Sequence, residues 1–414
     1  MAIIRSKWTA LFASNFLGIF NDNLLKNSII FIAVSWTMPN WLTQSQLISI
    51  VSASLIVPYL FLSPLGGRLA VIHSKKKVFV FFKLLEFPIM LIACVAFYFQ
   101  WVMLAVFSVL LMGILSCLYS PSKYSLIRDI GGVEGVSFGS GIFEMMAFLG
   151  ILTGTVIASV ISDHYNQWLT FGLFMGLALM GYLFTQSIRA KELPESKENP
   201  GHINPIPFLI ESYRYARGHK FVNSAVFGAS AFWLIGGMLQ MNLVIHCKHV
   251  YHVSNTLTGV VMAFAAIGIA LGTWAAGKIS GKEVKKGLIL IGISGMSILF
   301  FMLTFFQLNF WIFAGSIFAV AFMGGIFQIP CLSMLQSAKL GRKLGDMIAY
   351  LNLITFVFVL LGTLFFSLTT YFTEENSFAV FGVILAICLF VTFYFLKRSP
   401  EFLSETKRIL KKSN

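Results

Sequence analysis

Long apolar segments alternate with short polar or charged breaks along nearly the whole chain. A helix needs about 20 mostly apolar residues to cross the hydrocarbon core of a bilayer. Windows of that length lie near 9–36, 45–71, 78–99, 101–120, 138–162, 167–188, 221–246, 256–279, 286–306, 309–335, 346–372 and 377–396. Backbone groups in hydrocarbon must bond within their own segment, and these lengths suit helices rather than barrel strands. The pattern predicts twelve transmembrane helices.

Composition supports an all-α integral membrane protein. Hydrophobic residues make up 57% of the chain and charged residues 11%, which leaves too little polar surface to cover a soluble globule of this size. The first apolar run follows Arg5 and Lys7, carries Asp22 and Lys26, and lacks a small-residue cleavage site. We therefore expect a retained first helix and not a signal peptide.

The basic residues predict the orientation. With a cytoplasmic N-terminus, the clusters at 75–77, 123–128, 189–220, 282–286, 339–343 and 397–412 all fall on the cytoplasmic side, whereas the opposite loops carry only Lys248. The positive-inside rule then places both termini in the cytoplasm. We interpret the net charge of +14 as a topology signal with some attraction to anionic membrane lipids, and not as a nucleic-acid interface.

The polar segment 189–220 divides the predicted helices into six and six. It is rich in proline and charge, as expected of a cytoplasmic linker that ends in a short surface helix. We expect six-helix bundles at 1–188 and 221–396 and a basic cytoplasmic tail at 397–414. Three residue pairs recur at nearly the same offset in the two halves, namely Gly67 with Gly277, Pro121 with Pro330, and Glu144 with Asn352. Two parallel halves with a site near the midplane resemble the major facilitator fold.

Asp22 and Lys26 are the most informative polar residues, because a charge at bilayer depth costs at least about 2.5 kcal/mol and usually has a function. Four positions apart on one helix face, they could pair directly. The alternative to a functional role is a self-neutralising ion pair. Asn23 and its neighbours Asn21 and Asn27 add donors and acceptors around them.

Glu144 is the other deep carboxylate, and no charged residue lies within one helical turn of it along the chain. It could bind a cationic headgroup or a proton, or it could only bond a neighbouring helix. Lys83 and Glu86, near the cytoplasmic end of the third predicted helix, are expected to pair with each other or to snorkel.

Cysteine and histidine suggest no metal centre. Four of the five cysteines fall in predicted helices and are interpreted as small buried residues, while Cys247 falls in an outer loop with His246, His249 and His252. The histidines could bind a metal or sense pH, but without a nearby carboxylate we expect an ordinary interfacial loop. We expect no metal and no cofactor.

Two motifs together resemble the bacterial lysophospholipid transporter family of the major facilitator superfamily. They are Phe20 to Asn27, which reads FNDNLLKN, and Tyr119 to Tyr124, which reads YSPSKY. The similarity extends to 139–144, to Phe232-Trp233 and to Gly345 through Asn352. Gln240 and Val71 differ from the family pattern, which has an arginine and an aspartate there. The resemblance implies cytoplasmic loop motifs at Gly67, Arg68, Lys75, Ser120, Pro121, Lys123, Tyr124 and Arg128.

This resemblance implies transport of lysophospholipids such as lysophosphatidylethanolamine across the bacterial inner membrane by alternating access, with a separate cytoplasmic acyltransferase as partner. A zwitterionic headgroup needs a cationic and an anionic partner. We expect Lys26, Asn23 and Gln240 to meet the phosphate, and Asp22 or Glu144 the ammonium. Asn352 completes the predicted set.

The sequence also bears on two other classes of function. A major facilitator exporter or importer of another amphipathic molecule, such as a drug or a siderophore, would have the same architecture. An enzyme acting within the membrane would need a nucleophile beside a base, a His-x4-Asp signature or a metal cluster at membrane depth, none of which occurs in the sequence. We therefore expect a transporter and not an enzyme.

Overall fold

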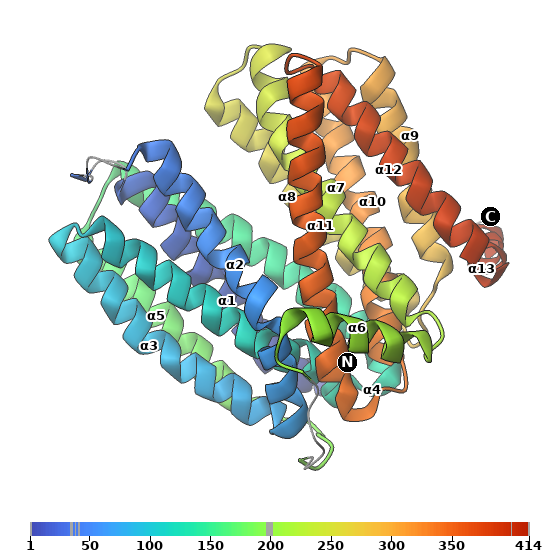
Figure 1. Cartoon of the computed structure of the whole chain (residues 1–414), viewed down its shortest axis with the longest axis horizontal. Coiled ribbons are helices and arrows are strands. Elements are labelled where there is room, and N and C mark those ends of the chain that lie inside the picture. Colours follow the sequence, from blue (N-terminus) through green and yellow to red (C-terminus); the bar gives the residue numbers. More distant parts are fainter. Residues whose placement is uncertain are drawn as a thin grey trace. The chain divides into compact units, whose positions relative to one another are not determined.

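The computed structural model describes residues 2–33, 36–37, 39, 42–195, 202–398 and 400–412, and all regular structure in these residues is helical (Figure 1). Positions 34–35 of the first predicted span, 196–201 of the predicted linker, and 399 and 413–414 of the predicted tail lie outside the described residues. The predicted all-α architecture is confirmed.

Five helices precede the linker: α1 (Ala2–Ile32), α2 (Gln44–Ile72), α3 (Lys75–Phe99), α4 (Val102–Asp163) and α5 (Gln167–Gln186). The short helix α6 (Pro205–Arg217) lies where a surface helix was predicted at the end of the linker. The remaining elements are α7 (Val222–His249), α8 (Asn255–Ser280), α9 (Gly287–Phe305), α10 (Phe310–Ser337), η2 (Gly341–Lys343), α11 (Leu344–Phe372), α12 (Ser377–Arg398) and α13 (Pro400–Lys412).

The predicted spans all correspond to helices. Within the described residues, ten helices are long and apolar enough to cross a membrane by length and composition. One of them, α4, has 62 residues and contains two predicted spans, 101–120 and 138–162. Helix α1 corresponds to the first predicted span, 9–36. Its polar residues make it less apolar than the ten helices that meet the criterion. The twelve predicted spans are therefore accounted for.

The long helix α4 corrects one expectation. The fourth predicted span ends at 120, directly before Pro121, but α4 continues through this proline and bends at Gly132, where φ is 65° and ψ is −173°. A positive φ favours glycine because it has no Cβ. Ser120 through Arg128, predicted as a cytoplasmic loop motif, therefore lie on a helix.

Polar residues at the helix starts explain why the helices begin where they do. Each accepts a hydrogen bond from a free backbone N–H of the first turn, which is the usual N-cap interaction. The caps are Thr43 for α2, Ser74 for α3, Asn166 for α5, Ser254 for α8 and Asn309 for α10. The breaks between apolar windows thus supply the signals that end one helix and start the next.

The chain forms two compact units. Unit 1 comprises Met1–Gly132, Leu149–Tyr215 and Leu340–Leu353, and unit 2 comprises Val133–Phe148, Ala216–Lys339 and Ile354–Asn414. In unit 1, α5 packs against α1 and α3; in unit 2, α10 packs against α7, α8 and α9. Among the described helices, three are divided between the units: the first turns of α11 belong to unit 1, whereas a segment of α4 and the last two residues of α6 belong to unit 2.

The predicted basic tail contains helix α13, which is docked on unit 2. Phe402 is fully buried and contacts the rings of Phe221 and Phe395. The Glu401 carboxylate accepts hydrogen bonds from Lys220 and from Lys286, the latter at 3.0 Å. These two bonds hold the pKa of Glu401 below its ordinary value.

Acidification is expected to loosen α13. A carboxylate with a lowered folded-state pKa stabilises the fold above its ordinary value, and the contribution disappears as pH falls through the lowered value. Because the Glu401 side chain is 41% exposed, the effect should stay below about 1 kcal/mol. The mobility of a spin label at Ser404 should rise on acid titration in the wild type. In Glu401→Gln it should already be high at neutral pH; equal mobility in both proteins would contradict the assignment.

Candidate functional site

Asp22 faces α4 and not Lys26. Its Oδ2 accepts a hydrogen bond from the Ser116 hydroxyl at 3.1 Å, and its buried Oδ1 has no hydrogen-bond partner among the described residues. Among the described residues no ion pair joins Asp22 to Lys26, so the alternative of a self-neutralising pair on one helix face is not seen. The i,i+4 spacing allowed the pair, but rotation of Asp22 toward α4 gives it a partner on another helix.

The asparagines of α1 connect that helix to its surroundings. Asn23 donates to the Ile19 carbonyl at 2.9 Å, and Asn27 donates to the Asn23 carbonyl at 2.8 Å and to the Thr155 hydroxyl at 2.9 Å. The Asn23 amide therefore bonds within its own helix, whereas the Asn27 amide connects α1 to α4.

Lys83 and Glu86 form a buried ion pair on α3, with 2.6 Å between Nζ and Oε1 and exposed fractions of 1% and 0%. The predicted pairing is confirmed, and the alternative of snorkelling toward the membrane surface is not seen for these two side chains. The approach lies off the hydrogen-bonding direction, so neither Glu86 oxygen has a hydrogen-bond donor among the described residues.

Tyr119 links these groups within unit 1. Its ring centroid lies 5.7 Å from Lys83 Nζ and 5.4 Å from Lys123 Nζ, distances at which an ammonium is attracted to an aromatic face. Its hydroxyl lies 3.5 Å from that of Ser116, which bonds Asp22. Lys123 is only 8% exposed. Residues Asp22, Lys83, Glu86, Ser116, Tyr119 and Lys123 are called the Asp22 cluster below.

Helix α11 contributes a further predicted residue to unit 1. Asn352 donates to the Ser120 hydroxyl at 3.1 Å, so two residues predicted separately meet. The start of α11 also packs closely on α2, because a Cβ at Gly67 would lie 2.7 Å from Ala349 Cβ. Such a contact requires glycine at position 67. Arg68, the next residue, is half-buried.

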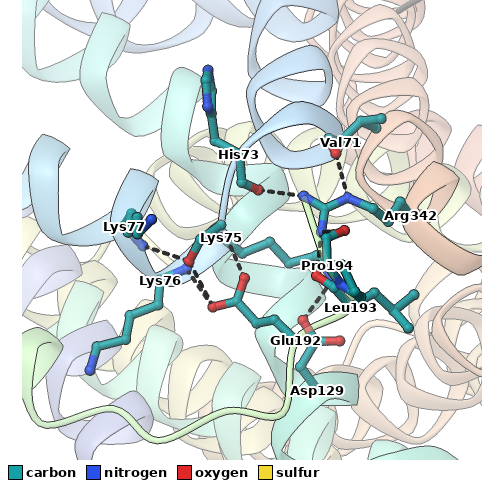
Figure 2. A network of polar contacts seen from close by, with 11 residues as sticks. Val71, His73, Lys75, Lys76, Lys77, Asp129, Glu192, Leu193, Pro194 and Arg342 are labelled. Carbon is teal, nitrogen blue, oxygen red and sulfur yellow. Dashed lines mark hydrogen bonds and ion pairs between the residues drawn. The ribbon is translucent and has the colours of Figure 1, made fainter. Parts of the chain in front are cut away.

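Arg342 lies at the centre of a second polar network, which the sequence did not predict (Figure 2). Its guanidinium donates to the carbonyls of Val71 at 2.5 Å and His73 at 2.7 Å, at the end of α2. It also donates to those of Leu193 at 2.6 Å and Pro194 at 2.8 Å in the linker. We call these five residues the Arg342 clamp.

Glu192 caps the start of α3 beside the clamp (Figure 2). Its carboxylate accepts from the backbone N–H groups of Lys75 at 2.5 Å and Lys76 at 3.1 Å, where a helix N-terminus favours negative charge. Hydrogen bonds from the Lys77 side chain and the Ser74 backbone N–H hold the pKa of Glu195 below its ordinary value. Residues of the predicted cytoplasmic linker are therefore bound to the α2–α3 turn through Glu192 and Glu195.

Lys75, a predicted motif residue, forms a buried ion pair with Asp129 at 2.6 Å. Asp129 follows Arg128 on α4, so the pair joins the start of α3 to the YSPSKY helix. Tyr124 and Arg128 are half-buried on the same helix. The family pattern has an aspartate at position 71. In this chain the main-chain carbonyl of Val71 accepts a hydrogen bond from Arg342.

Replacing Arg342 by lysine should loosen this network. One ammonium cannot reproduce the planar fork that reaches four carbonyls. Leaving carbonyls at the end of α2 without a donor should cost about 1–3 kcal/mol. We expect a lower unfolding temperature in detergent and faster maleimide labelling of a cysteine placed at Leu193. Lys339→Ala, an exposed change just before η2, is the control; equal labelling in both variants would contradict the clamp.

Glu144 and Gln240 belong to unit 2. Glu144 is 2% exposed and interacts with at least one other residue. Its segment packs on unit 2 through a hydrogen bond from Ser140 to Gln336 at 3.0 Å and a stack of Phe148 on Trp233. Gln240 is exposed on α7.

The predicted histidine loop is mostly helical. Helix α7 runs to His249, which places Cys247 and His246 inside it, both buried. The His246 Nδ1 lies 2.8 Å from the Ser377 hydroxyl, and aromatic rings including Phe313 and Phe381 surround the imidazole. Burial raises the pKa of the nearby Tyr251 phenol to about 12. His246 thus packs the start of α12 against α7.

Comparison with known proteins assigns the fold and the family. The sequence model of the Major Facilitator Superfamily matches residues 11–339. The chain belongs to this superfamily of membrane transporters. The crystal structure of the human organic anion transporter MFSD10 covers 94% of this chain and 98% of its own, with a TM-score of 0.72 at 14% identity. FucP in its outward conformation has a TM-score of 0.70 at 12% identity, over 95% of this chain and 98% of its own.

Curated relatives are more similar in sequence than these structures. The protein named lysophospholipid transporter LplT of Pectobacterium carotovorum is 24% identical over 85% of this chain and 83% of its own length. The protein of the same name from Photorhabdus laumondii is 25% identical over 83% of each. The chain is therefore a multi-pass membrane protein of a transporter family, with its similarity to these relatives spread over most of its length.

Proposed function

We propose that this chain moves lysophospholipids across the bacterial inner membrane. The observation that carries the proposal is the similarity over 83–85% of the chain to proteins named lysophospholipid transporters. The Asp22 cluster supports it chemically, since a zwitterionic headgroup needs charged partners away from water.

In this proposal Asp22 binds the headgroup ammonium. Its Oδ1 is available because Ser116 occupies only Oδ2. Lys26, half-buried one turn further along α1, is proposed to meet the phosphate together with Asn23 and Gln240. Glu144 is proposed as the alternative to Asp22 for the ammonium, and Asn352 completes the proposed set. A charge-assisted hydrogen bond to each end of the zwitterion would select this class of headgroup.

We further propose the six-helix halves 1–188 and 221–396, the linker 189–220 and the tail 397–414 as the domains, with both termini in the cytoplasm. The halves alternate access to the substrate, as in other major facilitator proteins. A separate cytoplasmic acyltransferase would consume the delivered lysophospholipid. The basic clusters, which the positive-inside rule assigns to the cytoplasm, support this orientation.

The test is uptake of labelled lysophosphatidylethanolamine by spheroplasts that lack their own lysophospholipid transporter, with and without this chain. The diacyl product should appear only when the protein is present. Absence of product despite verified membrane expression would contradict the proposal. A competition panel of drugs and siderophores on the same cells would then test the other amphipathic substrates.

A further inference from the structure

Helix α13 separates its acidic residues from its basic ones. Both of its carboxylates face unit 2, at the start of α9. Glu401 accepts a hydrogen bond from the Lys286 side chain at 3.0 Å, and Glu405 accepts one from the backbone N–H of Gly287 at 3.3 Å. The free N–H groups and the dipole of a helix start favour negative charge there. The acidic groups of α13 are therefore already bound within the protein.

Three basic residues of α13 point away from unit 2. Lys407, Arg408 and Lys411 are exposed, whereas Phe402 is fully buried and Thr406 is half-buried. With the rotation of an α-helix, the three cations lie within about 100° of its circumference. None of the three forms an ion pair with a residue that the structure describes. Three positive charges on one exposed face attract an anionic partner.

Helix α13 lies at the end of α12, where the apolar exposed surface of α12 stops (Figure 1). Phe390, Phe393 and Leu396 form an apolar stripe on α12, with exposed fractions of 61%, 61% and 43%. Such a stripe on a spanning helix faces hydrocarbon. The Lys397 ammonium lies 5.7 Å from the Phe393 ring centroid, and a lysine at the end of a span extends to the lipid headgroups. Because Pro400 starts α13 within one helical turn of Lys397, α13 begins at the level of the headgroups.

Leu403 favours a lipid surface as the anionic partner. Its side chain is 41% exposed and lies between the buried face of α13, which contains Phe402, and the face that carries Lys407. A helix in a membrane interface combines these features, with apolar residues toward the acyl chains and Lys or Arg toward the phosphates. The anionic lipids of the leaflet supply the negative charge.

We propose that Lys407, Arg408 and Lys411 bind the phosphate groups of anionic phospholipids in the leaflet next to α13. The arginine fork matches two phosphate oxygens, and the lysines add charge around it. Since α13 is packed on α9 and α12, lipid bound to this face stabilises unit 2. The inference rests on the position of the tail at the cytoplasmic membrane surface, proposed above, and holds whichever substrate the chain carries.

A dye on Ser404→Cys tests this assignment. The five native cysteines are buried, so the dye reacts at the exposed position 404. Dioctanoyl-phosphatidylglycerol, added to the purified full-length protein in detergent, should change the dye signal to saturation, and dioctanoyl-phosphatidylcholine should not. Replacing Lys407, Arg408 and Lys411 by glutamine should weaken binding about fivefold for each cation, or roughly 100-fold together. Equal binding by this triple variant and the wild type would overturn the proposal.

The matched control removes three cations from other exposed positions, again by glutamine, at Arg214, Lys282 and Lys339. It should bind phosphatidylglycerol as the wild type does. An equal loss in both triple variants would mean that only net charge matters, which contradicts a site on α13. Lys407→Arg with Lys411→Arg keeps the charges and should also bind normally; loss of binding there counts against a site that recognises charge.

Two further measurements separate the lipid from other partners. Phosphatidylglycerol should raise the unfolding temperature of the unlabelled wild type and not that of the α13 triple variant; an equal rise in both would place the lipid elsewhere. Poly-glutamate then replaces the phospholipid as the probe. A saturating dye response to it, with none to phosphatidylglycerol, would assign this face to an acidic protein and overturn the choice of a lipid. Neither measurement uses lysophospholipid, so failure of the proposed transport is distinguished from failure of this inference.

Discussion

Asp22→Asn is expected to lower lysophospholipid uptake by about 100-fold, to the background of cells without the protein. Asparagine has nearly the shape of aspartate, and its amide oxygen can still accept the hydrogen bond from Ser116. What it loses is the charge, and an ionic hydrogen bond contributes about 1.5–3 kcal/mol. The spheroplast assay with labelled lysophosphatidylethanolamine measures the effect, and membrane expression measured on the same cells checks insertion.

The matched control is Asp163→Asn, the same chemical change at the exposed end of α4. It should transport at the wild-type rate. Wild-type uptake by Asp22→Asn would remove Asp22 from the site, whereas loss of expression would mean that its bond to Ser116 is needed for the fold.

Lys83→Met alone is expected to destabilise the protein by about 3–5 kcal/mol, because it leaves the Glu86 carboxylate buried without its counterion. The double variant Lys83→Met with Glu86→Met should recover most of that loss, since it removes both charges and refills the space with apolar groups of similar length. Thermal unfolding of the detergent-purified protein compares the three forms.

The recovery is the informative part of this experiment. If the double variant is as unstable as the single one, the loss arises from packing around Gly18 and Gly181 and not from the unpaired charge. A single variant as stable as the wild type would mean that Glu86 is already neutral in the folded protein.

The helices could be predicted from the sequence because each needs an apolar window of fixed length. The predicted span 377–396, for example, is the helix Ser377–Arg398. Pro121 misled the prediction because proline usually ends a helix in water, whereas in a membrane protein neighbouring helices tolerate it. The family motifs located Asp22, Ser120 and Asn352, and the structure brings the last two together.

Contacts between distant segments could not be predicted. Asp22 and Lys26 satisfied the local spacing rule, but Ser116, 94 positions away, is the partner that Asp22 has. The sequence predicted Arg342 only as one of the basic residues of a cytoplasmic loop. Its hydrogen bonds go to main-chain carbonyls as far as 271 positions away, and such bonds produce no recognisable pattern of side chains in the sequence. The same holds for Glu192 at the start of α3.

The Arg342 clamp has a consequence for how the sequence can vary. All four of its acceptors are main-chain carbonyls, which every amino acid carries. The amino acids at positions 71, 73 and 193 can therefore be replaced during evolution without loss of these hydrogen bonds, provided that the backbone keeps its path. Among related chains, the arginine should be retained while the residues it binds differ, and searches for conserved pairs of side chains will overlook this connection.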